Sequence, residues 1–327
     1  MTTSPTASTT DFPSRIPVGI SACLMGEKVR YDGAHKRSDY CRDVLSRYFE
    51  FRQVCPEMAI GLGAPRPTIR LIASDAGVRA VQSTEPPKDV SASLAAVGDS
   101  VLDSHTDLCG FILTEKSPSC GLFRVKTYDS TGQLLHSKGR GLFAGRLTDR
   151  LPLLPVEEAG RLNDPHLREN FVLRVYAWHE WHNNLLPGLD MASITAFWAR
   201  YKFLVLAHNE SLYRQIGPLL GSAGRNDIDT VAAQFFTLLM QALATPTTRG
   251  SNTNALQHLQ GYLKNRIDAV EKKSLQLLIR QYKEGSVPLI VPLSMMRHLL
   301  ARYPDDYANR QKFLAPYPDE LGLRNHH

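Results

Sequence analysis

The chain has 327 residues, 43% of them apolar, which is enough for two domains that each bury a core of their own. No run approaches the roughly 20 apolar residues of a membrane span, and the Ser- and Thr-rich residues 1–14 lack the apolar core of a secretory signal. We therefore expect a cytoplasmic protein with a disordered leader over residues 1–14. The net charge of +6 favours a polyanionic partner such as nucleic acid, although many basic proteins bind none.

Up to about residue 147, short apolar runs alternate with helical stretches. Strand-like runs cover 17–22, 49–54 and 110–114, helical patterns cover 34–48 and 90–105, and residues 71–89 indicate a strand region with a turn. This alternation predicts an α/β domain with a Rossmann-like parallel sheet over residues 15–147. The glycine-rich stretch 139–145 lacks both the Gly-Lys-Ser/Thr ending of a phosphate loop and a helix after it, so we expect a turn and a sheet edge there.

The second half of the chain has a different pattern. Residues 148–165 are punctuated by prolines and are expected to form a connector. Beyond them, Leu, Phe, Ala and Met recur at three- and four-residue intervals, which predicts an all-helical domain over 166–310 and a tail over 311–327. The expected helices cover 167–181, 191–217, 230–243, 252–282 and 293–303.

Three of the five cysteines, Cys23, Cys55 and Cys120, lie at or just beyond the ends of strand-like runs. Loops that leave the carboxyl ends of parallel strands meet in one crevice, so we expect these thiols to converge. Three soft ligands leave one coordination position of a metal centre free for a substrate, which indicates an enzyme. Cys41, inside an expected helix, and Cys109, at the start of a strand, are expected to be buried thiols without a ligand role.

Polar residues beside these cysteines are candidates for chemistry. Glu57 is a candidate general acid/base, although from spacing alone an acid that complements a helix dipole after Pro56 is the simpler explanation. Arg66, in a loop rich in Gly and Pro, could meet an anionic or planar substrate group or form a salt bridge. Ser117 and Ser119 offer hydrogen bonds to a cluster, a substrate or a water, or else stabilise a surface turn.

At these motifs the sequence resembles a known family. Residues 15 to about 147 are similar to the thiouracil desulfidase family in the stretches Ser21-Ala22-Cys23-Leu24, Val54-Cys55-Pro56-Glu57 and Lys116-Ser117-Pro118-Ser119-Cys120-Gly121. Residues of roughly 165–310 resemble a helical domain that is often fused to it, through Tyr201-Lys202-Phe203, Asn254-Ala255-Leu256-Gln257-His258 and Val287-Pro288-Leu289-Ile290-Val291-Pro292. Fusions of this layout resemble tRNA 4-thiouridine desulfidases.

The resemblance implies one 4Fe-4S cluster per chain, held by the three thiolates named above, with one open iron for the soft sulfur of a thiocarbonyl. It implies hydrolytic conversion of 4-thiouridine in tRNA to uridine with release of hydrogen sulfide. Glu57 is then the acid/base partner and Ser117 the catalytic hydroxyl, with Ser119 as its rival. The expected substrate contacts are Arg66, Lys116 and Ser119.

The helical domain is expected to hold RNA. A modified base in folded tRNA must leave its stack at a cost of about a few kcal/mol, which contacts to phosphates would offset. The expected contacts, for which a solvated helix face is the simpler explanation, are Lys202, His208, Arg214, Lys264 and Lys272.

Two alternatives stay open at this point. The first is desulfuration of free thiouracils or thiouridine nucleotides, small thiopyrimidine substrates for which the helical domain would serve a homo-oligomer. The second is a zinc- or cluster-bearing RNA-binding protein without turnover. The preferred thiobase, the oligomeric state and the RNA footprint do not follow from the sequence.

Overall fold

The structure is a computed structural model that describes residues 15–75, 77–222 and 227–326. The chain divides into two compact units, with the boundary between Asp164 and Pro165. The expected leader over residues 1–14 lies outside the described residues. In the described part, no helix is long and apolar enough to cross a membrane.

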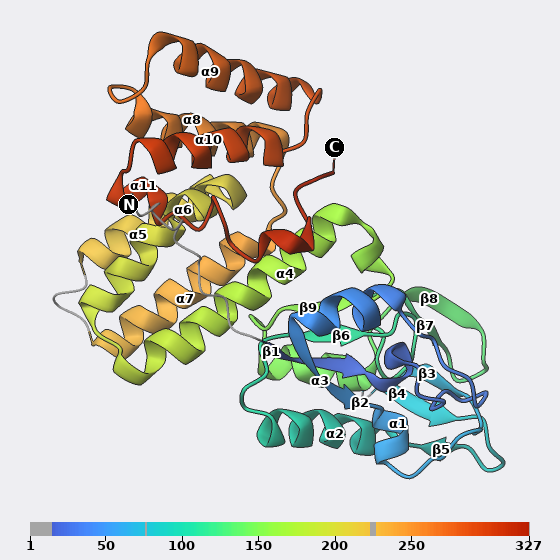
Figure 1. Ribbon diagram of the computed structural model, residues 1–327. Coiled ribbons are helices and arrows are strands. Elements are labelled where there is room, and N and C mark those ends of the chain that lie inside the picture. Colours follow the sequence, from blue (N-terminus) through green and yellow to red (C-terminus); the bar gives the residue numbers. More distant parts are fainter. Residues whose placement is uncertain (1–14, 76, 223–226, 327) are drawn as a thin grey trace, which may run out of the picture. The chain divides into compact units, whose positions relative to one another are not determined.

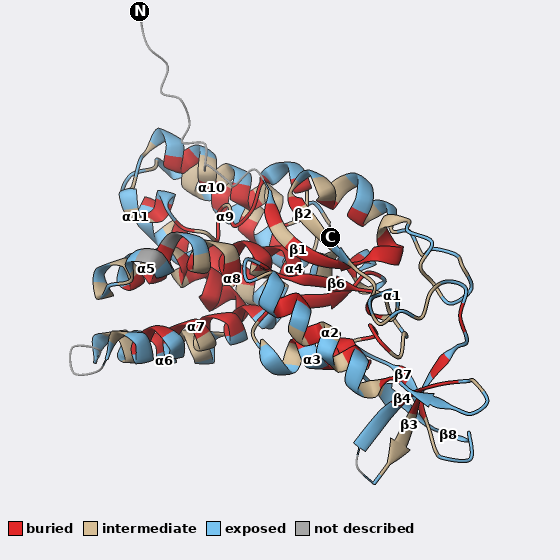
Figure 2. Ribbon diagram, turned by 90° about the horizontal axis from the view of Figure 1, so that it is seen from below, coloured by how far each residue is buried: buried red, intermediate tan, exposed pale blue. Residues whose placement is uncertain are grey.

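The first unit is built on a four-stranded parallel sheet with the strand order β2-β1-β6-β9 (Figure 1). Three of its strands are the predicted apolar runs, namely β1 (Ile16–Ser21), β2 (Phe49–Val54) and β6 (Phe111–Leu113). Figure 2 shows β1 and β6 as buried, which fits near-continuous apolar strands covered on both faces. An α/β unit with a parallel sheet is therefore confirmed.

Two helices accompany this sheet. α2 (Ser91–Ser104) agrees with the helix expected over 90–105, and α3 (Leu142–Arg150) packs against it. Phe143 of α3 contacts the ring of Phe111 on β6 edge to face, with 5.6 Å between the centroids. α3 was not predicted, because a helix was judged absent after the glycine-rich stretch 139–145.

That glycine-rich stretch has a packing role. Its first glycine, Gly139, ends the edge strand β8 (Leu134–Gly139), as expected of a sheet edge. Gly141 lies so close to the loop before Cys120 that a Cβ atom there would be 2.4 Å from the Ser119 carbonyl oxygen. The missing side chain therefore lets the start of α3 support the loop that carries a predicted metal ligand.

A second sheet, which the sequence analysis missed, completes the first unit. It has the order β5-β4-β3-β7-β8 and buries an apolar cluster that includes Leu71, Leu94 and Val125. Residues 71–89 were expected to hold only a strand region with a turn, whereas they belong to three antiparallel strands. Besides β8, this sheet contains β3 (Ile69–Ser74), β4 (Gly77–Gln82), β5 (Lys88–Asp89) and β7 (Val125–Tyr128).

The expected connector over residues 148–165 contributes the fourth strand of the parallel sheet, β9 (Val156–Glu158). Its acidic side chains, which suggested an exposed segment, are buried and bonded. Glu157 accepts a hydrogen bond from Arg161 (2.7 Å), and Glu158 accepts from the backbone N–H groups of Leu122 and Phe123 (2.9 and 3.0 Å). The partners of Glu158 lie about 35 residues earlier in the chain, so the local sequence did not reveal them and its prolines indicated a connector.

The helix expected over 34–48 is wrong. The Lys36 N–H donates to the Cys23 carbonyl (2.9 Å) and the Ser38 N–H donates to the Leu24 carbonyl (2.8 Å). These backbone donors bind the turn after β1 instead of an α-helix of their own. Only one π-helical turn (Tyr40–Val44) and one 3-10 turn (Leu45–Arg47) follow.

The second unit is helical in its described residues, as predicted. Trp181 stacks on Phe236 with 5.0 Å between the ring centroids, and Phe197 stacks on Tyr201 at 4.2 Å, so aromatic rings fill much of its core. Its helices are α4 (Pro165–His179), α5 (Met191–His208), α6 (Glu210–Gly221), α7 (Ile228–Ala244), α8 (Arg249–Leu263), α9 (Ala269–Glu284), α10 (Ile290–Arg302) and α11 (Asp306–Asn309).

Two expected long helices are each broken by a capping residue. Asn209 accepts a hydrogen bond from the Leu212 N–H (3.0 Å) and so begins α6 inside the range 191–217. Asp268 accepts from the Glu271 N–H (2.8 Å), which begins α9 inside the range 252–282.

The expected tail over 311–327 is also corrected, since part of it packs into the second unit. Phe313 is fully buried, and the buried Arg324 donates to Glu169 of α4 (2.7 Å). The segment was expected to be a tail because it contains no helical period. Its burial depends on partners that lie about 150 residues earlier in the chain.

Candidate active site

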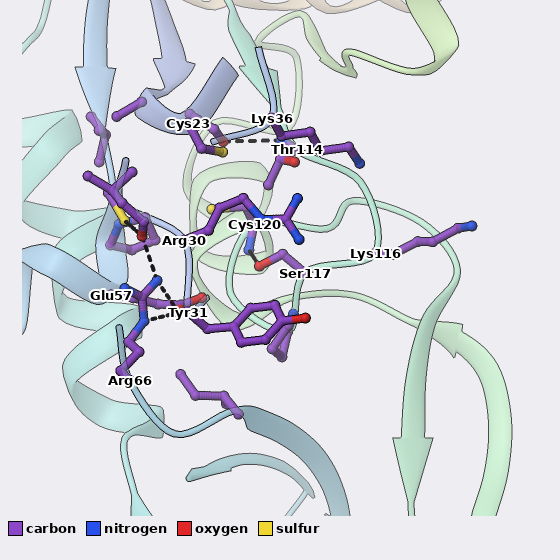
Figure 3. Close-up of a pocket in the computed structure, with 18 of the residues that line it drawn as sticks. Cys23, Arg30, Tyr31, Lys36, Glu57, Arg66, Thr114, Lys116, Ser117 and Cys120 are labelled. Carbon is purple, nitrogen blue, oxygen red and sulfur yellow. Dashed lines mark hydrogen bonds and ion pairs between the residues drawn. The ribbon is translucent and has the colours of Figure 1, made fainter. Parts of the chain in front are cut away.

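The carboxyl ends of β1, β2 and β6 open onto one cavity of about 430 Å³ in the first unit (Figure 3). Cys23, Cys55 and Cys120 all line this cavity. The structure thus brings together the three thiols that the sequence placed at the ends of separate strands, because parallel strands present their following loops at one edge.

Each of the three cysteines sits at a defined backbone position. Cys23 lies in a 3-10 turn (Ala22–Met25) directly after β1, and Cys55 is the residue before the short helix α1 (Pro56–Ala59). Cys120 follows β6 and is held by its backbone N–H, which donates to the Ser117 hydroxyl (3.1 Å). Turns that begin where a strand ends therefore fix all three thiols.

Burial raises the pKa of all three thiols above the ordinary cysteine value. The effect is largest at Cys120, where burial and the nearby Glu57 carboxylate both raise the pKa well above that value. These groups are protonated at neutral pH when no metal is bound, so metal binding would release protons.

The other two cysteines lie away from the cavity. Cys41 and Cys109 are buried, as expected, and burial raises their pKa values to about 11 and about 12. Neither lines the cavity.

Glu57 lies in α1, and each of its two carboxylate oxygens accepts hydrogen bonds from another side chain. Its Oε1 accepts a hydrogen bond from the Ser119 hydroxyl (2.7 Å), and its Oε2 accepts from Arg66 Nε (2.7 Å) and pairs with Arg66 Nη2 (2.6 Å). The side chain is only 13% exposed and lines the cavity. Ser119 and Arg66 therefore fix the orientation of the carboxylate at the cavity, a contact set that the dipole of a four-residue helix does not explain.

Arg66 is a structural clamp. Besides Glu57, its guanidinium contacts the Gly63 carbonyl (2.5 Å), the Val29 carbonyl (2.8 Å) and the Met58 sulfur (3.7 Å). Its side chain is 3% exposed. Because these partners occupy its donors, the expected substrate contact is replaced by the salt bridge that the sequence analysis held as the alternative.

The two serines have different surroundings. Ser119 is fully buried and does not line the cavity. Its hydroxyl donates its hydrogen bond to Glu57. Ser117 lines the cavity, and its oxygen accepts from the backbone N–H groups of Ser119 (3.2 Å) and Cys120 (3.1 Å). The Ser117 hydroxyl can therefore still donate into the cavity, whereas Ser119 positions Glu57 and does not contact substrate directly.

Lys116 lines the cavity but its side chain points away from the other labelled residues in Figure 3. Further cavity residues, Arg30, Tyr31, Lys36 and Glu115, were not predicted. Lys36 forms an ion pair with Glu115. The only sequence signal for Arg30 and Tyr31 was a turn-forming Arg-Tyr-Asp-Gly stretch, to which no function was assigned.

The donor set fits an iron–sulfur cluster. Among the described residues, no group of three His, Cys, Asp or Glu side chains lies close enough to hold a single metal ion. Iron–sulfur clusters are held by cysteine thiolates, and three cysteine thiols line this one cavity. Cys23, Cys55 and Cys120 are the residues that would hold it.

In the second unit, one expected RNA contact is wrong. His208 is 8% exposed, its Nδ1 bonds the Thr245 carbonyl (2.6 Å), and burial lowers its pKa to about 4, so it is neutral and inaccessible. Arg214 is exposed but forms an ion pair with Glu210 (2.5 Å).

Arg214 stays a prediction, as do the other three expected contacts. They lie in or beside different helices, namely Lys202 in α5, Lys264 directly after α8, and Lys272 in α9.

Comparison with known proteins gives two family matches. Residues 18–159 match the model of 2-thiouracil desulfurase, and residues 202–318 match DUF1722, a protein family of unknown function. The uncharacterized protein YbgA of Escherichia coli (strain K12) is 30% identical over 165 residues, which make up 50% of this chain and 98% of YbgA. A solved structure of the 4Fe-4S-dependent thiouracil desulfidase TudS is 28% identical, covers 46% of this chain and 95% of its own, and has a TM-score of 0.36.

The pKa directions predict how the five cysteines react in the native protein free of metal. At pH 8 the thiolate fractions of Cys41 and Cys109 are about 10⁻³ and 10⁻⁴, given pKa values of about 11 and 12. We expect iodoacetamide to label the half-buried Cys55 first, and Cys41 and Cys109 only after denaturation, as followed by peptide mass spectrometry. Because burial raises the pKa of Cys55 above the ordinary cysteine value, its labelling should accelerate about tenfold per pH unit below about pH 8. Rapid native labelling of Cys109 would show that its environment is misjudged.

Proposed function

This chain belongs to the proteins that join a 2-thiouracil desulfurase domain to a DUF1722 domain, and from that premise we propose that it removes sulfur from a thiopyrimidine with the help of a 4Fe-4S cluster. The observation that carries the proposal is the cavity shared by three thiols, an oriented carboxylate and a serine hydroxyl. When bound, the cluster supplies an open iron that polarises a thiocarbonyl through its soft sulfur.

The protein's own residues handle the water and the protons. Glu57, held by Arg66 and Ser119, takes a proton from the water that attacks the thiocarbonyl carbon and passes it to the sulfur. It then passes the second proton, that of the newly added hydroxyl, to the sulfur as the carbonyl forms. The carbon–oxygen bond forms, the carbon–sulfur bond breaks, and hydrogen sulfide leaves without net electron transfer. The Ser117 hydroxyl orients the water or the substrate from the opposite loop.

For the substrate we propose 4-thiouridine within tRNA. The supporting observation is a groove of about 390 Å³ between α8 and α9, lined by Gln257, Gln260, Gln276, Arg280 and Lys283. Among the described residues, Arg280 and Lys283 form no ion pair with a carboxylate, and Lys272 lies on the same helix. Unpaired cations beside amide groups suit a phosphate backbone.

Free thiouracil is the second candidate. The observation that favours it is that the catalytic cavity is built entirely from residues of the first unit. A cavity of about 430 Å³ falls within the size range of small-molecule sites, so a free base needs no contact from the helical unit.

Variants of the three polar residues test the catalytic assignment. Glu57→Gln and Ser117→Ala should keep the cluster yet lose about 10²- to 10⁴-fold in kcat for thiouracil desulfuration, because positioned proton-transfer groups contribute that much. Ser119→Ala should be milder, since Glu57 keeps its bond to Arg66. Iron content and hydrogen sulfide release are the two measurements. Undiminished turnover by Glu57→Gln would assign this carboxylate to structure alone.

Salt dependence tests the RNA substrate. If α9 contacts phosphates, log Kd for thiolated tRNA against log salt should change slope by about 0.7–0.9 for each contact removed in Lys272→Gln or Arg280→Gln. Arg150→Gln in the first unit is the control, because Arg150 is paired with both Asp99 and Asp103. Turnover of free 4-thiouracil should not depend on these residues. Identical slopes for all variants would favour the free base.

A further inference from the structure

The charges that line the cavity are mostly paired with one another. Glu57 binds Arg66, and Glu115 forms an ion pair with Lys36. Lys116 lines the mouth but points away from the other labelled side chains in Figure 3. Among the described cavity residues, this leaves Arg30, a cation whose ion pair with Asp32 is long (3.6 Å) and whose guanidinium lies over the Tyr31 ring.

The surroundings of Arg30 support this view. Its Nε atom is buried and has no hydrogen-bond partner among the described residues. Its nearest ion-pair partner, the Oδ1 atom of Asp32, is 3.6 Å away, which is beyond a good hydrogen bond. Because this Nε atom is buried, a ligand in the cavity meets the terminal nitrogens of the guanidinium instead, and the Arg30 side chain is 32% exposed.

Tyr31 stands beside it. Its ring lines the same cavity, is 46% exposed, and lies with its centroid 5.8 Å from the Arg30 guanidinium carbon. Figure 3 shows the ring at the cavity, on the side of Ser117. A flat heterocycle could stack on the exposed aromatic ring, and a carbonyl group on that heterocycle could accept hydrogen bonds from the neighbouring guanidinium.

The backbone presents these two side chains rigidly. The Gly33 N–H donates to the Arg30 carbonyl (2.9 Å), and the Ala34 N–H donates to Asp32 Oδ1 (3.0 Å), which closes a tight turn. Arg66 adds a further anchor, because its backbone N–H donates to the Tyr31 carbonyl (2.8 Å). Little ordering is then needed when a ligand binds.

We propose that Arg30 and Tyr31 form the recognition site for the pyrimidine ring, with the heterocycle stacked on Tyr31 and its remaining ring carbonyl accepting hydrogen bonds from Arg30. The inference rests on the proposed function and adds the residues that select the base. In 4-thiouracil the remaining carbonyl is at position 2, so Arg30 reads an atom that the reaction leaves unchanged. The substrate class is therefore a thiopyrimidine that keeps one carbonyl group.

The test compares 4-thiouracil with pyrimidine-4-thione, which lacks that carbonyl together with the neighbouring N1–H, using the full-length protein with its iron content measured. Arg30→Gln should lower kcat/KM for 4-thiouracil by about 10- to 100-fold, the contribution of a hydrogen bond from a charged donor. It should change kcat/KM for pyrimidine-4-thione by less than about threefold, so that the selectivity is lost. Arg37→Gln is the matched control and should change neither substrate, because Arg37 is paired with Asp39 and does not line the cavity.

Binding of the product uracil gives a readout that needs no turnover. Tyr31→Phe keeps an aromatic face and should bind uracil within about threefold of the natural protein, whereas Tyr31→Leu should bind at least about fivefold more weakly. Arg30→Gln should weaken uracil binding as well. Isothermal titration calorimetry measures all three.

The outcomes separate this inference from the proposed function. If the natural protein desulfurates neither thiopyrimidine, both fail. If it does so but Arg30→Gln keeps its preference for 4-thiouracil, only the recognition role is overturned. If Arg30→Gln affects 4-thiouridine monophosphate but neither free base, the guanidinium holds a phosphate and the assignment to the ring carbonyl is wrong.

Discussion

The buried guanidinium of Arg66 connects the separate parts of the active site. It binds Glu57 in α1, the carbonyl of Gly63 in its own loop, and the carbonyl of Val29 in the loop that follows β1. Removing one partner of such a buried pair leaves an uncompensated charge and costs about 3–5 kcal/mol. One side chain therefore fixes the loops after β1 and β2 relative to each other, and its donors are occupied by these contacts.

A chain of hydrogen bonds extends this constraint to the third loop. Glu57 accepts from Ser119, which precedes Cys120, while Ser117 in the same loop accepts from the Cys120 N–H. The path Arg66, Glu57, Ser119 thus joins the three loops that carry the cysteines. Arg30 and Tyr31 line the same cavity from a turn that is anchored by the same arginine.

Local signals in the sequence predicted the strand ends, the three cysteines and Glu57, because strand periodicity and the loops that follow strands are short-range properties. A salt bridge was one alternative for Arg66, but the common partner of Arg66 and Ser119 could not be predicted, because Glu57 lies 9 and 62 residues from them. The same reason explains the helix wrongly expected over 34–48, whose backbone donors bind the turn after β1, and the buried acids of β9. A charged residue in a sequence favours an exposed position, but a partner that is distant in the sequence can allow it to be buried, as it does for Glu158.

Iron content of the full-length protein, prepared without oxygen, tests the central claim most directly. The account predicts about four irons per chain in the natural protein and in Cys41→Ala and Cys109→Ala, and loss of the iron in Cys23→Ala, Cys55→Ala and Cys120→Ala. Stoichiometric zinc without iron, or a folded Cys109→Ala protein that contains no iron, would contradict it.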